Sequence, residues 1–156
     1  MAFLTSARYT RQLDDKPFPY QFGNPVAAAA TIYVGGICGM ATGVPGFVIN
    51  AVVSTTFQVW GISMAFNQFM QVYNNSAGAA SAFNVRTQRG CFAMFSGTAG
   101  DLLSQSTVGT RVYVIDDQTV GATSGGATRS FAGVHRQYDA DGTCWIELTP
   151  LATAPF

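Results

Sequence analysis

The chain has 156 residues, with eight basic side chains, eight acidic side chains and one histidine, so its formal net charge is zero. Its hydrophobic content of 48% is enough for one packed domain and excludes a wholly disordered chain. Balanced charge without clusters of Lys and Arg argues against nucleic-acid binding through counterion release.

The first 25 residues differ in composition from the rest of the chain. Pro17 and Pro19 favour an extended backbone, and the aromatic side chains here follow neither helical nor strand periodicity. The sequence therefore predicts an extended N-terminal arm, residues 1–25, before a single β domain, residues 26–156. The arm's aromatic side chains need pockets on this domain or on a neighbour. The candidate contact residues of the arm are Phe3, Arg8, Tyr9, Arg11, Asp14, Asp15, Phe18, Tyr20 and Phe22.

A charge-free run follows, in which 69 consecutive residues, 17–85, contain no Asp, Glu, Lys, Arg, His or Leu. A membrane span needs about 20 apolar residues in a row, and the best window, residues 44–66, is interrupted by Pro, Gly, Asn, Gln, Ser and Thr. A domain of this size cannot hide the whole run in its core. Contact with neighbouring protein chains is the interpretation we favour.

From residue 31 onward, short runs rich in Val, Ile, Phe, Tyr and Trp alternate with Gly, Asn, Asp and Ser, which indicates strands and turns. Helix is expected only at residues 26–30 and 101–105. The fold class is all-β, a small β-barrel or sandwich. The expected strands are residues 31–36, 47–54, 57–65, 68–73, 82–88, 90–95, 111–115, 131–137 and 143–148.

The clearest local element is a hairpin over residues 134–148. Its turn contains Asp139, Asp141 and Gly142, and apolar residues then alternate along residues 143–148. The Asp-x-Asp-Gly turn begins like a calcium loop but lacks the remaining oxygen ligands, so turn chemistry explains it. The three cysteines, Cys38, Cys91 and Cys144, are expected to be buried apolar residues.

No catalytic motif emerges. Adjacent Asp116 and Asp117 would point to opposite faces of a strand, and His135 is the only histidine. The glycine pairs at 35–36 and 125–126 lack the Lys-Ser/Thr of a phosphate loop. We expect no enzyme activity, cofactor, metal site or small-molecule substrate. An enzyme using His135 with Asp116, Asp117 or Asp139 stays as an alternative.

Four segments carry a family resemblance. Residues 72–80 hold an Asn-Ser-Ala-Gly-Ala turn, residues 85–92 a strand pair with Arg-Gly-x-Phe, residues 109–120 a Val-x-Asp-Asp-Gln-Thr-Val strand and turn, and residues 128–134 an Arg-Ser-x-Ala-Gly-Val strand. This order, ending in the Asp-x-Asp-Gly hairpin, resembles the head decoration, or cement, proteins of tailed bacteriophages. The resemblance spans about half of the chain.

The resemblance implies a β-tulip-like domain that forms a homotrimer on the outside of the virion capsid and clamps adjacent major capsid protein subunits. The N-terminus lacks the pattern of a signal peptide, so synthesis in the host cytoplasm is expected. The family brings no catalytic residues. The alternative is a carbohydrate- or receptor-binding module of a phage tail or cell surface, which exposed Trp60 or Trp145 would favour.

Overall fold

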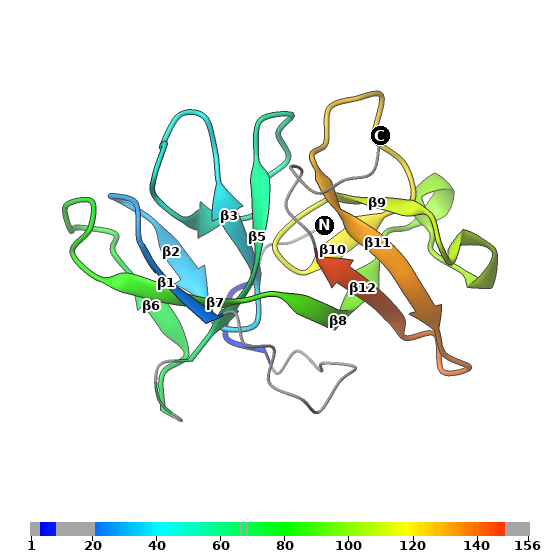
Figure 1. Ribbon diagram of the computed structural model, residues 1–156, viewed down its shortest axis with the longest axis horizontal. Coiled ribbons are helices and arrows are strands. Elements are labelled where there is room, and N and C mark those ends of the chain that lie inside the picture. The colour runs from blue at the N-terminus through cyan, green and yellow to red at the C-terminus, as the bar shows by residue number, and fades with distance from the viewer. Residues whose placement is uncertain (1–3, 9–20, 66, 68, 149–156) are drawn as a thin grey trace.

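The computed structural model describes residues 4–8, 21–65, 67 and 69–148. The described part is nearly all β, with 44% of its residues in strands and 5% in short helical turns, which confirms the all-β prediction. Two parts lie side by side in Figure 1. We call residues 21–88, with strands β1 to β7, the first lobe, and residues 90–148, with strands β8 to β12, the barrel.

The first lobe contains two antiparallel sheets. The larger sheet has the order β1(Gln21–Pro25), β7(Asn84–Gln88), β5(Gln58–Met64), β3(Ile37–Met40) and β4(Ile49–Asn50). The smaller sheet pairs β2(Thr31–Tyr33) with β6(Val72–Asn74). Apolar side chains from both sheets and their loops form one core cluster, which includes Val26, Ile32, Cys38, Val48, Tyr73 and Val85. This lobe thus has a core of its own.

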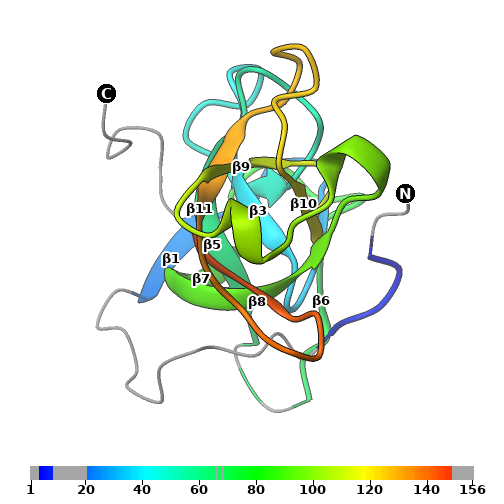
Figure 2. The ribbon, with the colours of Figure 1, turned by 90° about the vertical axis from the view of Figure 1, so that its right-hand side faces the viewer.

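The barrel closes through five strands in the order β10(Thr119–Gly121), β8(Gly90–Ser96), β12(Cys144–Leu148), β11(Phe131–Tyr138) and β9(Arg111–Val114). Its pairings are antiparallel except for β10 with β8, which run parallel. Two short 3-10 turns, η1(Ala99–Asp101) and η2(Gln105–Thr107), lie between β8 and β9 (Figure 2). Closure pairs every barrel strand on both edges.

A second core cluster is shared by the two parts. Ile37, Phe57, Val59 and Ile62 of the first lobe pack with barrel residues such as Phe92 and Val112, and all six are at most 2% exposed. Because this cluster is continuous across the boundary, the seam between the two parts is filled with apolar side chains. The lobe and the barrel therefore form one packed unit.

Several local predictions need correction. Residues 26–30 form no helix, because Val26 bridges Val48, Ala27 N donates to Val48 O at 3.1 Å and Ala29 has a left-handed φ of 59°. The expected strand 47–54 is reduced to two residues, β4. Strands β1, β3 and β10 were not expected. The expected helical turn at residues 101–105 is replaced by the two 3-10 turns, which begin or end at its limits.

The hairpin near residue 140 is confirmed. Strands β11 and β12 pair antiparallel, with His135 opposite Ile146 and Tyr138 opposite Cys144. The turn is held by Gly142 N, which donates to Asp139 O at 2.9 Å, and by Thr143 N, which donates to Asp141 Oδ1 at 2.9 Å. Gly142 has a φ of 85°, which a residue with a side chain rarely adopts. The two aspartates serve the turn, as the sequence indicates.

Candidate interaction surface

Residues 4–8, which we call the N-terminal strap, lie at the seam between the first lobe and the barrel. Leu4 is 9% exposed, and its backbone N–H donates to Asp117 Oδ1 of the barrel at 2.9 Å. At the other end of the strap, Arg8 N donates to Val34 O of the first lobe at 2.9 Å. The backbone N–H groups of the strap thus form hydrogen bonds with both the barrel and the first lobe.

The Arg8 side chain extends onto the barrel. Its Nη2 donates to Ala93 O at 2.8 Å, and its Cζ lies 4.5 Å from the centroid of the Phe95 ring. Burial lowers the pKa of Arg8, while the Asp117 and Asp116 carboxylates act in the opposite direction. Burial raises the pKa of Asp117, whereas the hydrogen bond from Leu4 N lowers it. Arg8, Asp116 and Asp117 therefore form a cluster of charged groups at the seam that is partly shielded from water.

Of the nine arm residues expected to make contacts, the structure describes Arg8 and Phe22. Arg8 is used within its own chain, as given above. Phe22 lies in β1, inside the larger sheet, with 39% of its surface exposed and the Arg89 Cζ 5.4 Å from its ring centroid. Phe3, Tyr9, Arg11, Asp14, Asp15, Phe18 and Tyr20 lie outside the described residues. The predicted arm therefore stands as an expectation for those seven.

The first lobe presents an unusual surface. Most described positions of the charge-free run are buried or half-buried, and the run supplies the lobe's core. Its large apolar side chains that reach the surface include Phe69, 82% exposed, and Val53, 52% exposed. Its other exposed positions are Gly, Ala, Ser, Thr, Pro, Asn and Gln. Such a surface can form hydrogen bonds with water, but it carries no charged side chain up to residue 85, just before Arg86.

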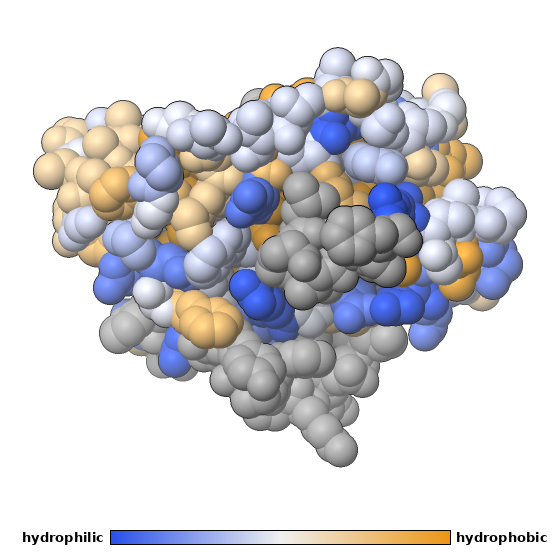
Figure 3. All heavy atoms as spheres, turned by 45° about the horizontal axis from the view of Figure 1, so that its top comes forward, coloured by the Kyte–Doolittle hydropathy of each residue, from blue (hydrophilic) through white to orange (hydrophobic). Residues whose placement is uncertain are grey.

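Figure 3 shows one face of the molecule coloured by hydropathy. The left end of this face is mostly beige and pale, and the deepest blue lies from the middle to the right. All six carboxylates of the described residues belong to the barrel. They are Asp101, Asp116, Asp117, Asp139, Asp141 and Glu147.

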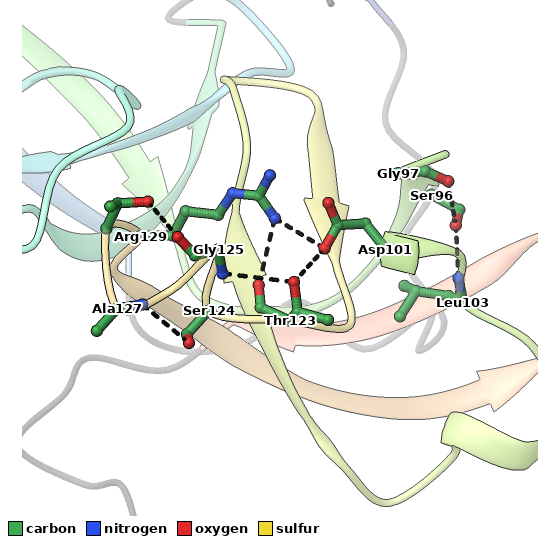
Figure 4. A network of polar contacts seen from close by, with 10 residues as sticks. Ser96, Gly97, Asp101, Leu103, Thr123, Ser124, Gly125, Ala127 and Arg129 are labelled. Atoms are coloured by element: carbon green, nitrogen blue, oxygen red, sulfur yellow. Dashed lines mark hydrogen bonds and ion pairs between the residues drawn. The ribbon is translucent and has the colours of Figure 1, made fainter. Parts of the chain in front are cut away.

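The barrel's loops are fixed by ionic contacts. Figure 4 shows Arg129 Nη1 at 2.8 Å from Asp101 Oδ1, the same oxygen that accepts a hydrogen bond from Thr123 Oγ1. Arg129 Nη1 also donates to Thr123 O at 3.3 Å. These bonds lower the pKa of Asp101, the Thr123 hydroxyl most of all. The loop after β10 is thereby fastened to η1.

The residues considered for catalysis are engaged in other ways. Each nitrogen of the buried His135 ring has a partner, Nδ1 being 3.0 Å from Thr107 Oγ1 and Nε2 donating to Gln137 O at 3.0 Å. Asp139 accepts from the Trp145 indole at 2.6 Å. Asp116 Oδ1 accepts from Gln118 N at 2.9 Å within the turn that ends β9. The hydrogen bonds of the His135 ring therefore go to Thr107 and Gln137 and not to the aspartates.

Side chains suited to other ligands show structural roles as well. Trp145 is 7% exposed, so it offers no platform for a sugar ring, and Trp60 is half-buried with the Arg89 Cζ 5.7 Å from its ring centroid. The three cysteines are buried, as expected. Among the described residues, no group of three or more His, Cys, Asp or Glu could hold a metal ion, and no helix is long and apolar enough to cross a membrane.

The strap and its partners could not be found from the sequence. Arg8 was identified as a contact residue, but its partners are backbone carbonyls, which carry no sequence signal. The Gly35-Gly36 pair was the available signal, because the strap passes directly over it. Comparison with known proteins adds no relative: no protein-family model, no curated protein and no solved structure matches this chain.

Proposed function

We propose that this chain is a non-enzymatic structural protein of a tailed-bacteriophage virion, a head decoration protein that binds the outside of the assembled capsid. It acts as a homotrimer and clamps adjacent major capsid protein subunits. It stabilises the shell by mass action, because it binds the assembled form and not the separated subunits. The motifs at residues 72–80, 85–92, 109–120 and 128–134 support this proposal.

The observation that carries the proposal is the surface that the charge-free run gives to the first lobe. Interface cores are depleted in charged residues and enriched in aromatic residues and Met. Residues 21–85 of this lobe combine a surface without charged side chains with the exposed side chains of Phe69 and Val53. A specific interface buries about 800 Å² on each partner. A subunit with a total surface of 8007 Å² that contacts both its own copies and the capsid commits a large share of it.

Binding to heads stripped of their decoration protein tests the proposal. Phe69→Asp places a charge at the most exposed apolar residue of the first lobe, and we expect at least a tenfold loss of affinity in co-sedimentation. Leu102→Asp is the matched control, because Leu102 is 58% exposed but lies on the barrel. If wild-type protein fails to bind heads, or if both variants bind as wild type, the proposed use of this surface is wrong.

The oligomeric state is tested separately. Native mass spectrometry of the isolated chain at micromolar concentration is expected to give a trimer. A monomer under these conditions, and also on the capsid in a cryo-EM map, would contradict the trimer. A glycan array probed with the same protein tests the carbohydrate-binding alternative, for which the buried Trp145 provides no support.

A further inference from the structure

The N-terminal strap lies in a seat assembled from distant parts of the chain. We define the seat as Val34, Gly35, Gly36, Ala93 and Asp117, which come from both the first lobe and the barrel. Leu4 and Asp117 are 113 positions apart, and Arg8 and Ala93 are 85 apart. The seat is therefore formed by the folded domain, and none of its residues belongs to the segment 9–20 that joins the strap to β1.

The seat has no space for side chains where the strap crosses it. A Cβ added to Gly35 would lie 2.0 Å from Arg8 O, and one added to Gly36 would lie 2.9 Å from Leu4 Cδ1. Gly35 also has a φ of 87°, so a side chain there would be strained in any case. Two consecutive glycines thus let a peptide backbone approach the domain closely.

An empty seat would leave polar groups without partners. Asp117 Oδ1 and Ala93 O, both on residues at most 8% exposed, accept hydrogen bonds from the strap, as does Val34 O. A buried acceptor left unsatisfied costs about 1–3 kcal/mol. The seat therefore favours an occupant with a backbone donor, an apolar side chain and a guanidinium four positions later.

The occupant need not come from the same chain. In Figure 2 the strap and β1 lie on opposite sides of the molecule, and twelve residues, 9–20, connect them. Twelve residues span at most about 40 Å, which is also enough to reach a neighbouring molecule of this size. The hydrogen bonds are the same in both arrangements, so exchange alters only chain entropy and local concentration.

We propose that the seat is a peptide-binding site for the N-terminal strap of a second copy of this chain, so that copies held close together exchange straps. The exchange joins molecules through contacts already formed within one chain. It is independent of the proposed capsid function, because it requires only a second copy. The exposed strap residues Thr5 and Ser6 make none of these contacts and leave the exchange unaffected.

Disulfide trapping between two full-length variants tests the exchange. Leu4→Cys on one chain and Gly36→Cys on another are mixed, partly unfolded and refolded together, and oxidised with glutathione disulfide. Leu4→Cys removes the Cδ1 atom that a Cβ at position 36 would meet, so the two cysteine side chains can meet in the seat. Covalent heterodimers are expected at least tenfold above the level given by Leu4→Ala/Ser6→Cys mixed with Gly36→Cys. Adding Gly35→Ala to the Gly36→Cys chain is expected to remove them. Trimer formation through other surfaces does not produce this pattern.

A single chain carrying both Leu4→Cys and Gly36→Cys is the positive control, and it should form the bond within one molecule. A bond in this control with no heterodimer in the mixture means that the strap stays in its own chain, and the exchange is wrong. If the control also forms no bond, while its unfolding remains cooperative, the strap does not occupy the seat and the proposal fails at its first step.

Discussion

The first lobe and the barrel fix their turns with different chemistry. In the lobe, buried amides and hydroxyls bind backbone carbonyls: Asn75 Nδ2 donates to Ala27 O at 2.8 Å and to Ala79 O at 2.9 Å, and Ser63 Oγ donates to Tyr33 O at 2.6 Å. In the barrel, Asp101 pairs with Arg129 and Arg136 with Glu147. Loops and strands are thus held by neutral hydrogen bonds in the lobe and also by ion pairs in the barrel.

The difference has a physical consequence for the surface. A neutral amide loses less solvation free energy on burial than a charged group, so it can organise a turn that another protein will cover. Residues 21–88 contain no Asp, Glu or His. The surface formed by residues 21–85 can therefore be buried against a partner without trapping an unpaired charge, and the lobe adds no carboxylate or imidazole to the acid response of the molecule.

The largest expected effect tests whether the two parts are one unit despite their different chemistry. Ile62→Ala removes a fully buried side chain of the shared core and should lower the free energy of unfolding by about 2–5 kcal/mol. Each part contains one tryptophan, Trp60 in β5 and Trp145 in β12. Single-tryptophan variants therefore report separately on lobe and barrel during unfolding in urea.

We expect both fluorescence transitions to shift together, because the cluster is continuous across the seam. Val53→Ala, at an exposed position of the same lobe, should change stability by less than about 0.5 kcal/mol. Two separate transitions, with only the Trp60 signal moved by Ile62→Ala, would show that the lobe unfolds independently of the barrel.

A smaller effect sharpens the contrast between amides and charges. Asn75→Ala leaves two carbonyls without their donor in a buried turn and should cost about 2–3 kcal/mol. The adjacent Asn74→Ala is the matched control, since Asn74 is exposed and its Oδ1 only accepts from Ser76 N at 3.0 Å. Equal losses in chemical denaturation would mean that the buried amide has no special role.

The barrel was easier to predict from sequence than the lobe. Cys144, Ile146 and Leu148 stand at alternate positions after an Asp-x-Asp-Gly turn, so both local signals agree on the hairpin. In the lobe, β1 is Gln-Phe-Gly-Asn-Pro, which has no β-branched residue and ends in proline. It is a strand because it pairs with β7 at the edge of the sheet, and such tertiary pairing has no local signature.

The candidate site divides in the same way. Arg8 and the Gly35-Gly36 pair are visible in the sequence, whereas their meeting depends on how the lobe packs on the barrel. Asp117 stands out in the sequence beside Asp116, but its bond to Leu4 N joins residues 113 positions apart. The sequence thus indicates which residues make contacts, but it does not indicate which residues they contact.

Acid tests a buried ionisable group that belongs to the barrel. Burial lowers the pKa of His135 below its usual value near 6.5, so the unfolded chain binds the proton more tightly than the folded one. The stability due to neutral His135 is therefore present above about pH 6.5 and is lost as the pH falls through the folded pKa, at most about 1.4 kcal/mol per pH unit. His135→Gln should remove this slope in urea unfolding between pH 8 and pH 5. An unchanged slope would assign it to the carboxylates.

Salt should produce the smallest difference between the two parts. Arg136 and Glu147 form an ion pair across β11 and β12 with 52% and 37% of their side chains exposed. Such a pair contributes less than about 1 kcal/mol and is screened at high ionic strength. Glu147→Gln should therefore lower stability slightly in 20 mM NaCl and not at all in about 1 M NaCl, where the Debye length is about 3 Å.

The loss caused by Asn75→Ala should be the same at both salt concentrations, because neither partner in its hydrogen bonds is charged. A salt-dependent loss at Asn75 would mean that the lobe relies on charges after all.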